Sequence, residues 1–189
     1  EIETRGSQYS HHEGIQNKIL KDQDIYYKKY WDNINNISIE SMKFKNDKDS
    51  IVFTEKVNIT ATKYCTLAGN RILFEPNMFN KISSAPPRYK NRKLPFEIDR
   101  GFIDVDEYEI NLSDGLEVEA LQEDVNITNK FGEYSFSIEK KSNSILIYKR
   151  RFVLNKGKFV KEDYKAFRDF WLKIVKHDKS KIVLIQKNN

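Results

Sequence analysis

The chain has 189 residues, a length that suits one main folding unit with a sizeable core. Apolar residues make up 39% and aromatic residues 13% of the chain, which is too much for a disordered protein. We therefore expect a single domain over residues 1–189, with a possible subdivision near 81–93. No apolar run approaches about 18 residues, so no membrane span is predicted.

The formal net charge of +5 is unevenly distributed along the chain. Residues 97–124 carry eleven acids against one cation, whereas residues 130–187 carry sixteen cations and six acids. The simplest interpretation is that the two blocks lie side by side and neutralise each other. We prefer this interpretation to nucleic-acid binding, because the sequence contains no recognised nucleic-acid module.

The first third of the chain predicts a short strand, a helix and then several strands. The strand is expected at residues 2–9, and the helix at residues 16–34 has apolar side chains that recur at helical spacing. The predicted apolar face of this helix consists of Ile19, Tyr26, Tyr30 and Ile34. From Ile37 to Ala61 the apolar period changes to two, which predicts short strands joined by turns.

Most of the remaining elements are predicted to be strands. The stretch at 80–93 contains a proline pair and many polar residues, so it is the best candidate for an exposed connection. Apolar alternation and turn residues delimit the strands. The strands are expected at residues 71–74, 94–98, 108–112, 116–121 and 125–129.

Residues 131–151 read FGEYSFSIEKKSNSILIYKRR, the pattern of a hairpin that ends in three cations. Tyr134, Phe136 and Ile138 point to one face of the first strand, which predicts a sheet with one wet face. The second strand, 145–154, begins apolar on both faces and should be more central. The polar linker between them suits a four- or five-residue loop.

Residues 161–176 form the clearest predicted helix, because their apolar side chains share one wide stripe. That stripe contains Tyr164, Phe167, Trp171, Ile174 and Val175. A last strand is expected at residues 182–185. The fold class is therefore mainly β, an antiparallel β-sandwich with a helix in the N-terminal half and a C-terminal amphipathic helix before the last strand.

Few residues offer catalytic or metal chemistry. Cys65 follows the alternating sequence ITATKY, so a buried strand cysteine is favoured over a thiolate with a histidine partner. His11 and His12 are expected in a solvated loop, because no second cluster with ligand spacing accompanies them. Asp104 and Asp106 share one face of a strand, which leaves weak calcium binding open. We predict no catalytic residue, no metal and no cofactor.

Two groups of residues form the candidate interaction surface, where cations could contact anionic groups. They are Arg88, Tyr89 and Arg92 in the connection, and Lys149, Arg150 and Arg151 at the end of the hairpin.

Several short motifs occur in an order that resembles a known family. They are GNRILFEP at 69–76, RKLPF at 92–96, LSDG at 112–115, VEAL at 118–121, FGEY at 131–134, YKRR at 148–151, and the helix with Tyr164, Phe167 and Phe170. Together they resemble the non-catalytic β-domain that follows the papain-like core in bacterial transglutaminase-like proteins, a domain family of unknown function. The resemblance covers residues 69–187. Ser113 and Gln122 depart from it, because the family usually has proline at these places.

The resemblance implies an Ig-like accessory domain, extracytoplasmic in location, either periplasmic or secreted. It also implies a preceding papain-like catalytic core in the same parent chain as partner. The family's catalytic Cys, His and Asp belong to that core, so none is assigned here. We expect a structural or interaction domain that positions the enzyme. The alternative is a binding module for a glycan or a protein, which an exposed aromatic patch from Tyr26, Tyr30, Trp31 or Tyr89 would favour.

Overall fold

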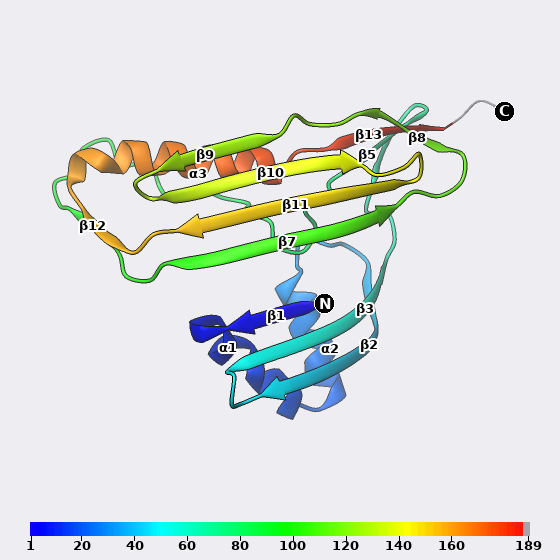
Figure 1. The fold of residues 1–189 in the computed structure, drawn as a ribbon, viewed down its shortest axis with the longest axis horizontal. Coiled ribbons are helices and arrows are strands. Elements are labelled where there is room, and N and C mark those ends of the chain that lie inside the picture. The colour runs from blue at the N-terminus through cyan, green and yellow to red at the C-terminus, as the bar shows by residue number, and fades with distance from the viewer. Residues whose placement is uncertain (187–189) are drawn as a thin grey trace. The chain divides into compact units, whose positions relative to one another are not determined.

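The computed structural model describes residues 1–186, and the chain divides into two compact units, Glu1–Tyr64 and Cys65–Asn189. Antiparallel strands build both units (Figure 1). This confirms the predicted mainly β fold with a helix in the N-terminal half and a C-terminal helix before the last strand. The subdivision expected near 81–93 falls inside the second unit. Lys187, where the resemblance ends, lies outside the described residues.

The first unit is a three-stranded sheet with helical segments. Its elements are β1 (Ile2–Arg5), α1 (Gly6–His12), the 3-10 helix η1 (Glu13–Asn17), α2 (Leu20–Tyr30), β2 (Ile37–Asp47) and β3 (Val52–Ala61). The strand order is β1-β3-β2, and both pairings are antiparallel. The strand predicted at 2–9 is too long: Gly6 has a positive φ of 55°, which turns the backbone out of the sheet, and α1 follows.

Helix α2 buries a face that differs from the predicted one, although Ile34, which follows the helix, is buried as predicted. Ile19 is 67% exposed and Tyr30 is 43% exposed, whereas Tyr27 and Trp31 are buried. These two rings lie four residues apart, and their centroids are 5.2 Å from each other. The Tyr27 hydroxyl donates a hydrogen bond to the buried carboxylate of Glu55, so this polar contact, which apolar periodicity does not detect, selects the buried face.

The second unit contains three sheets and the long helix. Its elements are β4 (Thr66–Ala68), β5 (Arg71–Phe74), β6 (Phe96–Ile98), β7 (Phe102–Asn111), β8 (Leu116–Ala120), β9 (Val125–Asn129), β10 (Gly132–Lys140), β11 (Ile145–Leu154), β12 (Gly157–Phe159), the 3-10 helix η2 (Lys161–Asp163), α3 (Tyr164–Asp178) and β13 (Ile182–Gln186). The strand orders are β7-β11-β10-β9, β4-β5-β13-β8 and β12-β6. No helix of the described chain is long and apolar enough to cross a membrane.

The predicted hairpin is formed by β10 and β11, which are joined by four residues, 141–144. Strand β11 lies between β7 and β10, which confirms its predicted central position. Gly132 opens β10 at a point where a Cβ atom would lie 1.9 Å from the carbonyl oxygen of Val153. Only glycine fits this close approach of the two strands.

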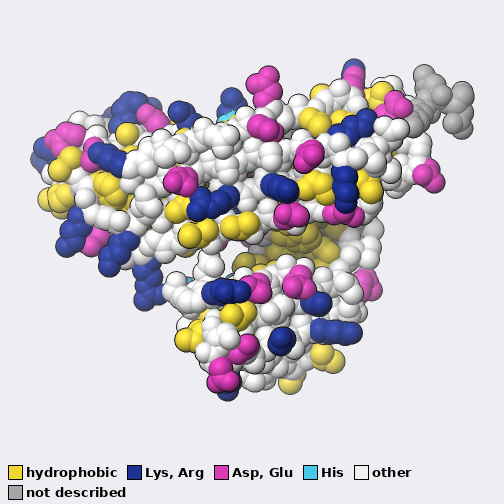
Figure 2. All heavy atoms as spheres, viewed as in Figure 1, with side chains coloured by type: hydrophobic (Ala, Val, Ile, Leu, Met, Phe, Trp, Pro, Cys, Tyr) yellow, Lys and Arg dark blue, Asp and Glu magenta, His cyan; other side chains and the backbone are white. Residues whose placement is uncertain are grey.

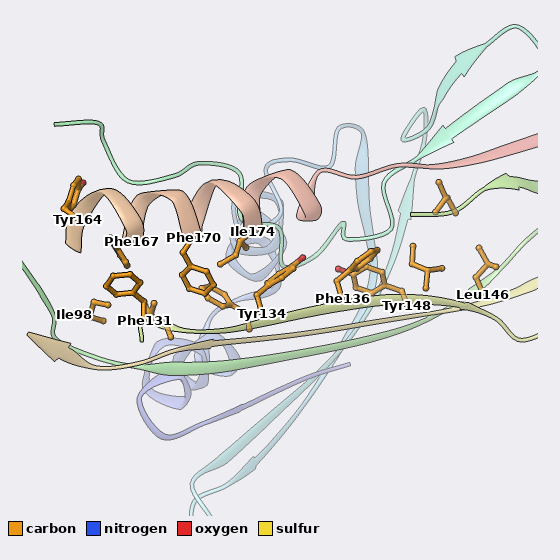
Figure 3. Packing of buried hydrophobic residues seen from close by; sticks show 14 of the residues in the cluster. Ile98, Phe131, Tyr134, Phe136, Leu146, Tyr148, Tyr164, Phe167, Phe170 and Ile174 are labelled. Carbon is orange, nitrogen blue, oxygen red and sulfur yellow. The ribbon is translucent and has the colours of Figure 1, made fainter. Parts of the chain in front are cut away.

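The core of the second unit lies between the sheet β7-β11-β10-β9 and helix α3 (Figure 3). Phe131, Tyr134 and Phe136 project from the sheet, and residues of the predicted apolar stripe of α3 project toward them. Ile182 and Leu184 of β13 extend the same buried cluster. The second layer of the sandwich is therefore part helix and part sheet. Each fully buried large apolar side chain contributes roughly 1.5–3 kcal/mol of transfer free energy.

The acidic and basic blocks do lie side by side, as predicted. Strand β7, which carries part of the acidic block, pairs with the basic strand β11, and Lys149 lies opposite Glu107 in this register. Lys141 forms an ion pair with Glu109 at 3.2 Å. The uneven charge along the sequence is thus partly cancelled across one strand pair.

Candidate functional site

A groove of about 730 Å³ in the second unit is lined mainly by basic residues. We call it the basic groove. It is lined by Arg88, Tyr89, Lys90, Asn91, Arg92, Lys93, Lys161, Glu162, Tyr164, Lys165, Arg168 and Asp169. One wall is residues 88–93 of the connection, and the other is formed by η2 and the first turns of α3. Figure 2 shows Lys and Arg side chains gathered at the end of this unit where α3 begins.

The walls of the basic groove are held together by hydrogen bonds from α3 to the connection. The Tyr164 hydroxyl donates to the Pro87 carbonyl at 2.8 Å, and Arg168 Nε donates to the Pro86 carbonyl at 3.0 Å. The connection is therefore exposed along Arg88–Lys90, as predicted, but it is fastened to the helix at its prolines.

Aromatic rings and a guanidinium group form the centre of the basic groove. Arg92 lies 4.4 Å from the ring centroid of Tyr164 and 5.6 Å from that of Tyr89. It also donates through Nε to the carbonyl of Leu94 at 2.9 Å. Stacking on aromatic rings fixes an arginine without neutralising it. The Tyr89 ring remains 54% exposed beside this fixed charge.

The charges of the basic groove are mostly uncompensated. Seven Lys or Arg residues line it against two acids, and both acids have lysine partners. Lys165 lies 2.6 Å from Asp169, and Lys161 lies 3.7 Å from Glu162. Arg88, Lys90 and Lys93 form no ion pair within residues 1–186. The arrangement can attract anions, because like charges gathered in a hollow strengthen the local field.

Lys149 and Arg151, the other predicted surface cations, lie elsewhere. They line a separate hollow of about 400 Å³ on the outer face of the sheet, together with Glu107 and Asp124. Arg151 Nη1 lies 2.7 Å from a carboxylate oxygen of Glu133. The structure thus brings Arg88, Tyr89 and Arg92 together in the basic groove but places the hairpin cations in a hollow of mixed charge.

Arg150 is buried, contrary to the prediction of a surface residue. Its side chain is 2% exposed, because alternate residues of β11 face the core and Arg150 lies between the outward-facing Lys149 and Arg151. Arg150 Nε and Nη2 donate to the two carboxylate oxygens of Asp178 at 2.9 and 3.1 Å, and Nη1 donates to Asp106 at 2.7 Å. We call Arg150, Asp106, Asp178 and Tyr134 the buried ion cluster.

Every charge of the buried ion cluster has several partners. The Tyr134 hydroxyl donates to Asp178 at 2.8 Å, the Ile82 backbone N–H donates to the same carboxylate at 2.9 Å, and Asn80 Nδ2 donates to Asp106 at 3.2 Å. Burial would lower the pKa of Arg150, but the charges of Asp178 and Asp106 outweigh it and the pKa is raised. Burial also raises the pKa of Tyr134. The cluster therefore joins β7, β10, β11, α3 and the start of the connection.

Cys65 is exposed, which corrects the prediction of a buried strand cysteine. Strand β3 ends at Ala61, and Lys63 adopts a positive φ of 58°, so the chain has left the sheet before it reaches the thiol. Partial desolvation raises the pKa of Cys65. His12 and His177 are engaged by Glu55 and Gln122, at 2.6 Å in each case. No histidine among residues 1–186 is hydrogen-bonded to this thiol.

A second polar cluster lies in the first unit, where the sequence predicted a solvated loop. His12 is 9% exposed, and its Nδ1 lies 2.6 Å from the fully buried carboxylate of Glu55. The Tyr30 ring packs edge-on against His12 at 5.3 Å. Burial is the main cause that raises the pKa of Tyr27, which also bonds Glu55. The signal that could have indicated this cluster is Glu55 itself, which follows Phe53 on the inward face of β3.

The described residues contain no group of three or more His, Cys, Asp or Glu side chains that could hold a metal ion. Asp104 and Asp106 do share one face of β7, but Asp106 is already neutralised by Arg150. Of the aromatic residues proposed for an exposed patch, Tyr30 and Tyr89 are exposed and Trp31 is buried. Tyr89 is the one that lines the basic groove.

Comparison with known proteins identifies the second unit. Residues 70–184 match the model of a family described as a domain of unknown function with a solved structure, DUF3858. The match begins just after the boundary between the two units and ends within β13. Searches of curated proteins and of solved structures returned no significant match.

Proposed function

The chain belongs to the DUF3858 family of domains of unknown function, and from this premise we propose that it is a non-catalytic structural and interaction domain. The observation that carries the proposal is the state of its single thiol. Cys65 is exposed, its pKa is raised by desolvation, and no imidazole is hydrogen-bonded to it in the described chain. A nucleophilic cysteine requires the opposite, a lowered pKa and an adjacent base.

The partner in this proposal is a papain-like core, transglutaminase-like or peptidase-like, in the same parent chain. The order of the motifs between residues 69 and 187 supports this assignment through the resemblance described above. In such an arrangement the domain supplies a rigid neighbour to the enzyme and a surface for contact. An extracytoplasmic location belongs to the same proposal. The parent protein should therefore be found in the culture medium or be released by osmotic shock, while a cytoplasmic marker protein stays inside the cells.

The proposal predicts that the 189-residue chain has no thiol-dependent activity of its own. Transamidation and peptide hydrolysis should stay at the level of buffer in assays of the wild-type chain, and Cys65→Ala should be indistinguishable from it. Alkylation of Cys65 by iodoacetamide near neutral pH should be slower than that of an unperturbed thiol, because only the thiolate reacts. Measurable activity that Cys65→Ala abolishes would refute the proposal.

A further inference from the structure

We infer that the basic groove binds an anionic polysaccharide, a chain of sugar rings that bear carboxylate or sulfate groups. The inference rests on the proposed function only in treating the domain as an interaction module, and it adds the site and the class of ligand. Arg88, Lys90 and Lys93 supply the charge, and Tyr89 supplies an exposed aromatic face. These residues lie in one hollow of about 730 Å³, a size typical of ligand sites.

The positive charges of the groove are suited to a polymer with repeated anions. The three free cations lie on the connection, while Arg92 and Arg168 are held in place by Tyr164 and Pro86. Arginine binds carboxylate and sulfate through parallel hydrogen bonds, and lysine attracts them as a point charge. A fixed guanidinium beside exposed lysines can orient one anionic group of the polymer and attract its neighbours.

The aromatic content of the groove favours sugars over other anions. None of the lining residues is aliphatic, whereas protein interfaces rely on an apolar centre that excludes water. Single-stranded nucleic acids need several exposed rings for successive bases, and here Tyr89 is exposed while Tyr164 is buried. A tyrosine ring can instead cover the apolar face of one sugar and leave its hydroxyl in water.

The test is a calorimetric titration of the 189-residue chain with polygalacturonate, dextran sulfate, neutral dextran and poly-L-glutamate. Binding of at least one anionic polysaccharide and none of dextran is expected, and affinity should fall as salt is added. Polygalacturonate tests the carboxylate and dextran sulfate tests the sulfate, so the preferred polymer identifies the anionic group.

Two matched variants locate the site. Arg88→Ala/Lys90→Ala/Lys93→Ala should weaken binding about tenfold, the summed effect of three exposed ionic contacts. The control removes three exposed lysines from the other end of α3, as Lys173→Ala/Lys176→Ala/Lys179→Ala, and should leave the affinity unchanged. Equal losses in both variants would show that binding depends on net charge alone and would overturn the inference.

The variant Tyr89→Ala separates sugar recognition from charge. It should weaken polysaccharide binding by roughly three- to tenfold while leaving net charge unaltered. An affinity that is higher for poly-L-glutamate than for either polysaccharide, and that is indifferent to Tyr89→Ala, would assign the groove to an acidic protein segment instead. No binding of any polymer would also overturn the inference. Neither result would bear on the absence of thiol chemistry, which the Cys65→Ala assay tests separately.

Discussion

Arg150 shows how much the environment of a residue depends on which face of a strand it occupies. The sequence does not distinguish the three consecutive cations Lys149, Arg150 and Arg151. In the structure, however, Arg150 is buried with two carboxylates, whereas its two neighbours are exposed. Burying a charge is unfavourable unless it is paired and hydrogen-bonded. In the buried ion cluster that condition is met, because the guanidinium group of Arg150 is hydrogen-bonded to both Asp178 and Asp106.

Arg150→Ala should therefore lower the free energy of unfolding by about 3–5 kcal/mol, because it leaves two carboxylates without their cation in the core. Urea unfolding followed by fluorescence measures the change. The control Arg151→Ala, which removes an exposed ion pair, should cost no more than about 1 kcal/mol. If Arg150→Ala does not fold, Tyr134→Phe tests the same cluster through one hydrogen bond to Asp178, with an expected loss of about 1.5–3 kcal/mol. Equal effects of Arg150→Ala and Arg151→Ala would contradict this account.

At the scale of elements, strands and the long helix were predicted more accurately than the short helix. Helix α3 buries Phe167, Phe170 and Ile174, as its 3.6-residue period indicates. The prediction of the buried face of α2 was wrong, because that face combines two aromatic rings with Gln23, a polar residue. Apolar periodicity assigns polar residues to the solvent face, so it cannot identify a helix that packs through hydrogen bonds.

His177, near the C-terminal end of α3, should make the free energy of unfolding depend on pH. The pKa of His177 is lowered by burial and by Lys176, against an opposing effect of Asp178. The unfolded chain, with an ordinary histidine pKa of about 6.5, therefore binds this proton more readily than the folded chain. The stabilising contribution is complete above that pKa and is lost as the pH falls from it toward the lower folded pKa.

His177→Gln should remove this part of the pH dependence. The free energy of unfolding of the wild-type chain should decrease more than that of the variant between about pH 7.5 and pH 5. Urea titrations at both pH values measure the two differences. Identical decreases in the two proteins would show that His177 does not contribute.

At the scale of the whole molecule, the chain consists of two units with separate interiors. The main hydrophobic cluster contains residues of the second unit alone, from Ile72 to Leu184. The first unit buries its own set around Tyr27, Phe53 and Glu55. The family match at 70–184 also lies entirely within the second unit. Because the main hydrophobic cluster is built from residues of the second unit, this unit has what it needs to fold alone.

The fragment 65–189 should accordingly fold without the first unit. We expect a cooperative urea transition and the near-ultraviolet circular dichroism of packed aromatic rings, since its core is intact in the fragment. Limited proteolysis of the full chain should cut between Ala61 and Thr66, where β3 has ended and β4 has not begun. A fragment without a cooperative transition would show that the 189 residues form one folding domain.

Only one of the two walls of the basic groove could be predicted from the sequence. Arg88, Tyr89 and Arg92 are close in sequence, so their common surface followed from the polar connection that carries them. The opposite wall, with Lys161, Lys165 and Arg168, belongs to a helix far along the chain. Its approach depends on hydrogen bonds from Tyr164 and Arg168 to proline carbonyls, which no local pattern indicates.

The sequence by itself determined the positions of most strands and of α3, because strand and helix periods are local properties of neighbouring side chains. It determined the hairpin 131–154, the stripe of α3 and the pairing of acidic with basic segments. The tertiary structure alone decided that Arg150 is buried, that His12 meets Glu55, that Cys65 is exposed and which cations share a groove. These outcomes depend on contacts between residues distant along the chain, whose geometry arises only when the layers pack.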